Sequence, residues 1–253
     1  MDDQPTTQRK GIYLLPNLLT TGALFAGFYS IVAAIDGHFQ AAAWAIYIAM
    51  FLDGMDGRVA RMTSTASDFG KEYDSLADMV SFGVAPAIVT YQWGVERLAE
   101  YGAIWGRLGW LAAFLYAAAA AFRLARFNTD GAGHDQRHFQ GLPSPPAAAA
   151  VVSMVWVSTF YQIEGLVALV AGITITAVAG LFMMSRFRYR SFKDVSPGRR
   201  VRFANLLLIP LVIIVIAIEP PLMLFSLFVI FACSGPIEWL WRRRRKARLK
   251  SEA

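Results

Sequence analysis

The chain has 253 residues, of which 56% are hydrophobic, and its formal net charge is +6 at pH 7. A soluble domain is rarely this apolar: the mean hydropathy is +0.44, and several apolar runs approach the roughly 20 residues that a helix needs to cross a bilayer. The composition therefore excludes an ordinary soluble enzyme, and the single cysteine, Cys233, excludes an intrachain disulfide.

Apolar segments recur along the whole chain and predict an all-α protein of eight membrane-spanning helices. The first of them follows MDDQPTTQRK without a small-residue cleavage site, so we interpret it as a retained helix and not as a signal peptide. The predicted spans are 16–35, 40–61, 69–93, 103–127, 144–163, 165–184, 203–219 and 222–241.

Positive charges gather on one side of these predicted spans. Of the 24 lysines and arginines, all but Arg97 and Arg107 fall in segments that this topology places on the same side. Basic loops stay in the cytoplasm, so we expect both termini to be cytoplasmic, with the protein in a bacterial inner membrane. Membrane orientation explains these charges better than nucleic acid does, and the tail RRRRKARLK at 242–250 is expected to bind anionic lipids.

Carboxylates interrupt the apolar sequence between the second and third spans, in FLDGMDGRVARMTSTASDFGKEYDSLADMVSFGVAP at 51–86. Asp53 and Asp56 are spaced i, i+3 near the end of one helix, and Asp74 and Asp78 are spaced i, i+4 near the start of the next. Each spacing places both carboxylates of a pair on one helix face. The junction is short, which makes the helices antiparallel neighbours, and the two acidic faces can then meet at one depth.

Four converging carboxylates in a membrane need positive charge, because each costs about 2.5 to 3.5 kcal/mol on insertion scales and they repel one another. Arg61 can neutralise one of them, whereas divalent cations can neutralise all four. Hard Mg²⁺ and Mn²⁺ prefer oxygen ligands, and two such ions about 3.5 to 4 Å apart commonly serve phosphoryl chemistry. Gly54, Gly57, Ala60 and Gly70 leave bare backbone beside the carboxylates for a bulky ligand, although small residues also serve close helix packing.

The pattern Asp53-x2-Asp56-Gly57-x2-Ala60-Arg61-x8-Gly70-x3-Asp74-x3-Asp78 resembles the signature of the CDP-alcohol phosphotransferases at every defined position. The resemblance implies a six-helix membrane core, usually a homodimer, with a di-metal site open to the cytoplasm. It also implies a reaction in which an alcohol attacks the lipid-linked phosphate of a CDP-activated lipid and CMP leaves.

The same resemblance implies roles for individual residues. Asp53, Asp56 and Asp74 would ligate two ions of Mg²⁺ or Mn²⁺, and Asp78 would ligate the second ion and act as the general base. Gly57 and Ala60 would make room for the cytidine nucleotide. The full set expected to bind the CDP-lipid is Gly57, Ala60, Arg61, Gly70 and Ser81.

Three further stretches resemble the phosphatidylserine synthase branch, in which CDP-diacylglycerol and L-serine react: EYDSLADMVSFGVAPA, FRLARFN and FQGLPSPPAAA. Arg123 and Arg126, at i, i+3, can bind the carboxylate of serine, and Asn128 is a further candidate for serine binding. Glycerol 3-phosphate also suits two arginines, so a phosphatidylglycerophosphate synthase remains an alternative. The arginines can instead anchor the membrane edge, and polar residues such as Ser81 and Asn128 often only satisfy a neighbouring helix.

An alternative from another class is a cation transporter, which predicts acidic residues along a path across the bilayer, whereas here they gather at one end. His134 and His138 in the polar loop TDGAGHDQRHFQGLP could bind zinc, but we interpret this loop as a flap beside the site. The resemblance covers about residues 11 to 184, and the last two spans exceed the six-helix core. The predicted organisation is an interfacial segment, the catalytic core, a basic cytoplasmic loop, two additional helices and a basic cytoplasmic tail, at 1–15, 16–184, 185–202, 203–241 and 242–253.

Overall fold

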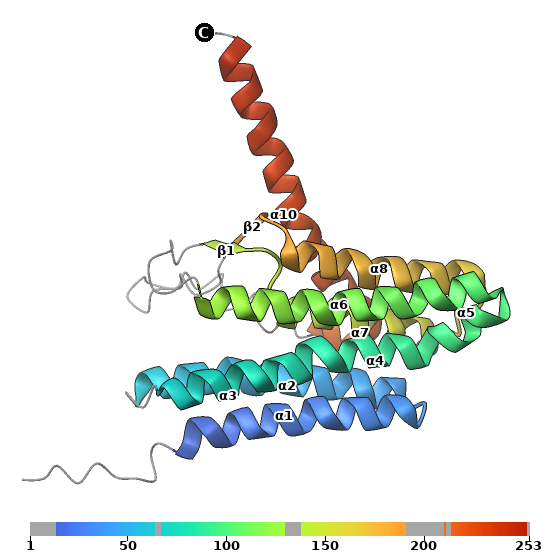
Figure 1. Ribbon diagram of the computed structural model, residues 1–253, viewed down its shortest axis with the longest axis horizontal. Helices are drawn as coiled ribbons and strands as arrows, with labels where there is room; N and C mark the ends of the chain where they lie inside the picture. The colour runs from blue at the N-terminus through green and yellow to red at the C-terminus, as the bar shows by residue number, and fades with distance from the viewer. Residues whose placement is uncertain (1–13, 64–66, 130–137, 191–209, 211–213, 252–253) are drawn as a thin grey trace, which may run out of the picture.

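The computed structural model describes residues 14–63, 67–129, 138–190, 210 and 214–251. Over these residues the chain is helical apart from short connections and two strands of three residues (Figure 1). The helices are α1 (Leu14–Ile35), α2 (Phe39–Met62), α3 (Asp68–Asp78), α4 (Ala85–Thr90), α5 (Glu96–Glu100), α6 (Ala103–Thr129), α7 (Ser144–Phe160), α8 (Leu166–Met184) and α10 (Pro220–Ser251), and the strands are β1 (His138–Gln140) and β2 (Arg188–Arg190).

The predicted all-α membrane fold is confirmed. Among the described helices, four are long and apolar enough to cross a membrane, namely α1, α6, α8 and the part of α10 up to Arg245. The first six predicted spans correspond to α1, α2, the helical stretch 68–100, α6, α7 and α8. The predicted span 203–219 lies mostly outside the described residues, and only 210 and 214–218 are seen there as helix.

The stretch 68–100 is a run of helices joined through two wider π-helical turns, Met79–Val84 and Tyr91–Val95. Such turns insert an extra residue into a helix and often occur at functional sites. The first begins directly after Asp78 and buries Ser81, Phe82 and Gly83. The path of the chain therefore changes at the point where the acidic segment meets the core.

Small side chains allow the helices to pack closely. Ala23, Ala26 and Ala33 of α1 are buried with Ala42 and Ala49 of α2, and Figure 1 shows the two helices side by side. Small residues let helix backbones approach each other where lipid supplies no hydrophobic driving force. This packing fixes the position of α1 against the acidic end of α2.

The strands β1 and β2 are antiparallel and form a ribbon that joins the segment before α7 to the segment after α8. Residues beyond β1 continue the attachment, because Gly141 N–H donates to the carbonyl of Phe187 at 2.8 Å and Leu142 N–H to that of Phe182 at 3.0 Å. Gly141 has φ +81°, and a Cβ there would lie 2.3 Å from the carbonyl oxygen of Met183. These two strands were not predicted from the sequence.

The helix α10 packs along α7 and its C-terminal end projects away from the other helices, past β1 and β2 (Figure 1). The eighth predicted span ended at residue 241, but the helix continues through the basic tail to Ser251. Tyr189 of β2 packs against α10. The centroid of its ring lies 5.7 Å from that of Phe231, with the two rings tilted by 36°, and its hydroxyl donates to the carbonyl of Ala232 at 2.9 Å.

Candidate active site

Three carboxylates from two helices converge near the end of α2. One oxygen each from Asp53, Asp56 and Asp74 lies within 4.8 Å of the other two. Asp56 is 5% exposed, and the other two are partly buried. The predicted meeting of the two acidic faces is therefore observed for these three residues. An all-oxygen donor set of this kind fits a hard divalent cation, which would also compensate the repulsion between the carboxylates.

Asp78 lies beside this cluster, one helical turn after Asp74. Its side chain is within hydrogen-bonding reach of Asp53, and the charges of Asp53 and Asp74 repel its own. The positive charge of the Arg123 guanidinium attracts the Asp78 carboxylate and so opposes this repulsion. Asp78 thus lies close enough to Asp53, Asp74 and Arg123 for their charges to act on its carboxylate.

Thr20 of α1 fixes the orientation of the Asp56 carboxylate through a hydrogen bond. Its hydroxyl donates to Oδ2 of Asp56 at 2.7 Å and also lies 3.1 Å from the carbonyl oxygen of Pro16. Both side chains are buried. Thr20 was not predicted as a site residue, and the signal for it in the sequence was the adjacent polar pair Thr20 and Thr21 within a mostly apolar helix.

Thr21 supports the second acidic helix. Its hydroxyl donates to the carbonyl of Asn17 at 2.7 Å, and the hydroxyl of Tyr73 therefore donates to Thr21 across 2.9 Å. Tyr73 lies in the middle of α3 and directly precedes Asp74, so this contact fixes the acidic part of α3 relative to α1. Two adjacent threonines of one helix thus position carboxylates on two others.

The surface next to the carboxylates is open at two glycines. A Cβ at Gly54 would meet nothing within 4 Å, and one at Gly57 would meet only Nη1 of Arg61 at 3.5 Å. Ala60 is half-buried and Arg61 is exposed. A ligand can therefore approach the backbone of α2 directly beside Asp53 and Asp56.

Two of the expected ligand-contacting residues have structural contacts of their own. The N–H of Gly70 donates to Oγ of Ser67 at 3.0 Å, which caps the start of α3. Ser81 is fully buried and its hydroxyl donates to the carbonyl of Ala23 at 3.1 Å. Ser81 therefore joins the π-helical turn to α1 in this structure and does not face the open surface.

The expected serine-binding residues lie at the end of α6 that faces the acidic cluster. Arg123 donates from Nη1 to Oγ of Ser144 at 2.8 Å, and its Nε is buried without an acceptor among the described residues. Arg126 donates to the carbonyl of Gln140 in β1 at 2.9 Å, and Asn128 donates to Oγ of Ser75 at 2.9 Å. Arg123 thus lies near the carboxylate of Asp78, whereas Arg126 is hydrogen-bonded to the ribbon formed by β1 and β2.

The predicted flap between α6 and α7 is described only in part. His134 lies outside the described residues, and His138 begins β1. The open alternative of a zinc site at these histidines therefore stays untested.

A family model described as CDP-alcohol phosphatidyltransferase matches residues 13–184, which include the acidic cluster, its threonine supports and the arginines of α6. A Helicobacter pylori (strain J99) protein named CDP-diacylglycerol–serine O-phosphatidyltransferase is 37% identical over 233 residues, covering 91% of this chain and 92% of its own length. A Mycobacterium leprae protein of the same name is 32% identical over 93% of this chain and 78% of its own length. An archaetidylserine synthase of Methanothermobacter thermautotrophicus is 37% identical over 150 residues, 58% of this chain and 60% of its own length.

Proposed function

The chain belongs to the CDP-alcohol phosphatidyltransferase family, and from that membership we propose that it transfers the phosphatidyl group of CDP-diacylglycerol to the hydroxyl of L-serine, giving phosphatidylserine and CMP. The observation that carries the proposal is the convergence of Asp53, Asp56 and Asp74 within 4.8 Å on helices that the family model covers. The names of the relatives support serine as the acceptor over glycerol 3-phosphate. Family membership also speaks against the cation transporter.

The carboxylates of Asp53, Asp56, Asp74 and Asp78 are proposed to hold two divalent cations, Mg²⁺ or Mn²⁺. The fit rests on the donor set, which is hard oxygen throughout, and on the proximity of carboxylates that need a counter-charge. When bound, the ions would supply Lewis-acid stabilisation of the charge on the diphosphate and on departing CMP. Thr20 keeps Asp56 oriented for this role through its hydrogen bond.

Asp78 is proposed to act as the general base. As the serine oxygen forms its bond to the phosphorus of the lipid-linked phosphate, its proton passes to a carboxylate oxygen of Asp78. The bond from that phosphorus to the oxygen bridging to CMP breaks, and CMP leaves with the electron pair. The position of Asp78 between the acidic cluster and Arg123 supports this role, because an acceptor bound near Arg123 would present its hydroxyl to Asp78.

The two substrates are proposed to enter from different sides of the cluster. The CDP-lipid would lie over the open backbone at Gly57 and Ala60, close to Arg61 and Gly70. Ser81 would contribute from its buried position, by holding the π-helical turn after Asp78 in place.

Serine would bind on the α6 side, where Nε of Arg123 has no described acceptor and can pair with a carboxylate. Arg126 and Asn128 would complete this side of the site. Their observed partners are Gln140 and Ser75, so each already has a fixed orientation.

The protein is an integral membrane enzyme, and we place both termini and the acidic cluster on the cytoplasmic side of a bacterial inner membrane because the basic residues gather there. The proposed organisation keeps 16–184 as the catalytic core, with 203–241 as additional helices. It also keeps a homodimer as the expected assembly, in line with the family resemblance.

The proposal is tested by incubating the purified protein with CDP-diacylglycerol and a panel of alcohols that includes L-serine, glycerol 3-phosphate and choline. We expect CMP release with serine and a lipid product of the mass of phosphatidylserine. Asp53→Asn should abolish the reaction, whereas Asp68→Asn, which changes an exposed carboxylate at the same junction, should not. Reaction with glycerol 3-phosphate and not with serine would contradict the acceptor while leaving the metal site intact.

A further inference from the structure

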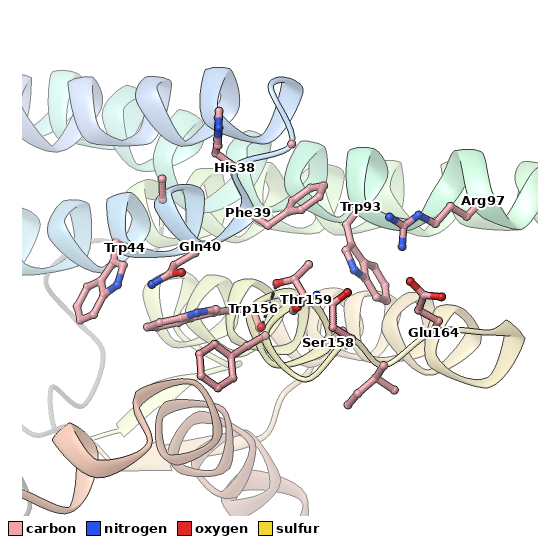
Figure 2. Close-up of a pocket in the computed structure, with 15 residues that line it drawn as sticks. His38, Phe39, Gln40, Trp44, Trp93, Arg97, Trp156, Ser158, Thr159 and Glu164 are labelled. Atoms are coloured by element: carbon pink, nitrogen blue, oxygen red, sulfur yellow. Dashed lines mark hydrogen bonds between the residues drawn. The ribbon is translucent and has the colours of Figure 1, made fainter.

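A cavity of about 660 Å³, whose lining residues are drawn in Figure 2, lies at the end of α2 remote from the acidic cluster. Its walls come from the connection between α1 and α2, the start of α2, α5, and the end of α7 with the connection to α8. Gln40 lines it, and at about 1.5 Å per residue the stretch of α2 from Gln40 to Asp53 is roughly 20 Å long. The cavity is therefore separate from the proposed active site.

Opposite charges face each other across this cavity. Arg97 of α5 and Glu164, just before α8, both line it, and Figure 2 shows their charged ends pointing toward the same space. They do not form an ion pair with each other in the part of the chain that the structure describes. The site thus presents a cation and an anion to an occupant at two separate points, which suits a molecule that itself carries both charges.

Tryptophans form much of the remaining wall. Trp93 and Trp156 are each 2% exposed, while Trp44 is 43% exposed, and the rings of Trp44 and Trp156 lie 5.2 Å apart (Figure 2). Indole faces attract ammonium groups, and tryptophan is enriched where membrane helices meet the headgroup layer. Figure 2 shows Trp93 beside Arg97 and Glu164, and Trp44 and Trp156 toward the other end of the cavity. An ammonium group at Glu164 would therefore lie near the indole of Trp93.

Polar groups of α7 add acceptors beside these rings. The hydroxyl of Ser158 donates to Sδ of Met154 at 3.6 Å, and that of Thr159 donates to the carbonyl of Val155 at 2.9 Å. Because each hydroxyl donates its proton to a group within α7, its oxygen can still accept a hydrogen bond from an N–H group of a ligand. The mouth is flanked by apolar side chains, with Phe160 55% exposed and Ile163 46% exposed.

We propose that this cavity binds the zwitterionic headgroup of a phospholipid, with the phosphate at Arg97 and the ammonium at Glu164 beside Trp93. The volume lies within the range of about 300 to 1,000 Å³ that is usual for small-molecule sites. The exposed apolar side chains at the mouth would contact the acyl chains, which a free zwitterion in water lacks. The cavity and the acidic cluster lie at opposite ends of the helices, so a molecule in the cavity would not occupy the proposed substrate site.

The test measures binding of lysophosphatidylethanolamine to the full-length protein in detergent, by tryptophan fluorescence and by native mass spectrometry. We expect saturable binding that is at least about tenfold tighter than that of lysophosphatidylglycerol, which lacks the ammonium group. Free phosphoethanolamine, the same headgroup without a chain, should also bind at least about tenfold more weakly. Equal binding of the two lysolipids would overturn the recognition of a zwitterion, and equal binding of phosphoethanolamine would overturn the assignment to a lipid.

Two pairs of variants locate the site. Arg97→Gln should weaken binding of both lysolipids by about tenfold, whereas Glu164→Gln should weaken only lysophosphatidylethanolamine and so remove the preference. The matched controls are Arg107→Gln and Glu100→Gln, exposed charges near the same end that do not line the cavity. Unchanged lysolipid preference in Glu164→Gln would overturn the proposal.

CMP release should be unchanged in all four variants, because the cavity is remote from the acidic cluster. CMP release separates lipid binding in the cavity from phosphatidyl transfer at the acidic cluster. Loss of lipid binding with normal CMP release would support the proposed lipid site as a site separate from the active site. Loss of CMP release in Arg97→Gln or Glu164→Gln, with binding of both lysolipids intact, would overturn it.

Discussion

The hydroxyl of Thr20 donates to Oδ2 of Asp56 across 2.7 Å, and both side chains are almost wholly buried. The bond crosses from α1 to α2 and occupies one oxygen of the most buried carboxylate in the acidic cluster. A group that hydrogen-bonds to a metal-ligating side chain fixes the orientation of that ligand and so commonly affects metal affinity.

Thr20→Val keeps the shape of the side chain and removes this hydrogen bond. Because Asp56 loses its fixed orientation, we expect the Mg²⁺ concentration for half-maximal activity to rise by about 10- to 100-fold. Activity at saturating Mg²⁺ should largely return. Thr174→Val is the control, since Thr174 is exposed on α8 and its hydroxyl only donates to Val170. An unchanged Mg²⁺ dependence would show that Thr20 has only a packing role.

Removal of divalent cations tests the acidic cluster directly. EDTA should abolish CMP release, and Mg²⁺ or Mn²⁺ should restore it, because converging carboxylates need a counter-charge to bind a diphosphate. The measurement is CMP release in buffer treated to remove metals, followed by titration of each ion. Full activity without metal would rule out the di-metal arrangement.

Asp78→Asn preserves the shape of the proposed base and removes its ability to accept a proton. We expect kcat to fall by at least about 10²-fold, the scale of general-base catalysis. Binding of CDP-diacylglycerol should persist, since Asp53, Asp56 and Asp74 still form the cluster. Near-normal turnover, measured as CMP release under saturating substrates, would assign the proton to another residue.

Arg123→Ala should raise the KM for serine by roughly ten- to a hundred-fold and that for CDP-diacylglycerol far less, because one charge-assisted contact to the carboxylate is lost. Arg123→Lys should recover only part of the loss, since lysine lacks the two-pronged guanidinium. Serinol, which has no carboxylate, should be a poor acceptor for the native enzyme, and the alanine variant should discriminate against it less.

The control for this prediction is Arg107→Ala, which removes an arginine near the other end of α6. It should leave both KM values unchanged. If serine and serinol react equally well with the native enzyme, the carboxylate is not recognised and the role given to Arg123 is wrong.

Gly235→Ala tests the attachment of α10 to β2. A Cβ at Gly235 would lie 2.4 Å from the ring of Tyr189, which is 1% exposed and cannot move aside without losing its bond to Ala232. We expect overpacking to lower the free energy of unfolding by about 1 to 3 kcal/mol. The measurement is the midpoint of thermal unfolding in detergent, which should fall. Ser234→Ala, on the exposed side of the same turn, should have little effect. Equal midpoints for the two variants would mean that the contact is not maintained.

The sequence by itself determined the fold class and the local content of the site. Long continuous apolar runs predict membrane helices because a helix satisfies every backbone hydrogen bond within one segment of about 20 residues. The i, i+3 and i, i+4 spacings place Asp53 with Asp56 and Asp74 with Asp78 on single helix faces. The family resemblance followed from the same spacings. All of these are properties of one helix or of two neighbours joined by a short turn.

Only the tertiary structure decided which partners the other side chains contact. It turned Ser81 onto Ala23, gave Arg126 a partner in β1 and placed Thr20 against Asp56. It also joined α5 to the end of α7 around a cavity that no motif marks. The physical reason is that periodicity fixes the direction of a side chain relative to its own helix, whereas its partner depends on close packing between segments far apart in the chain.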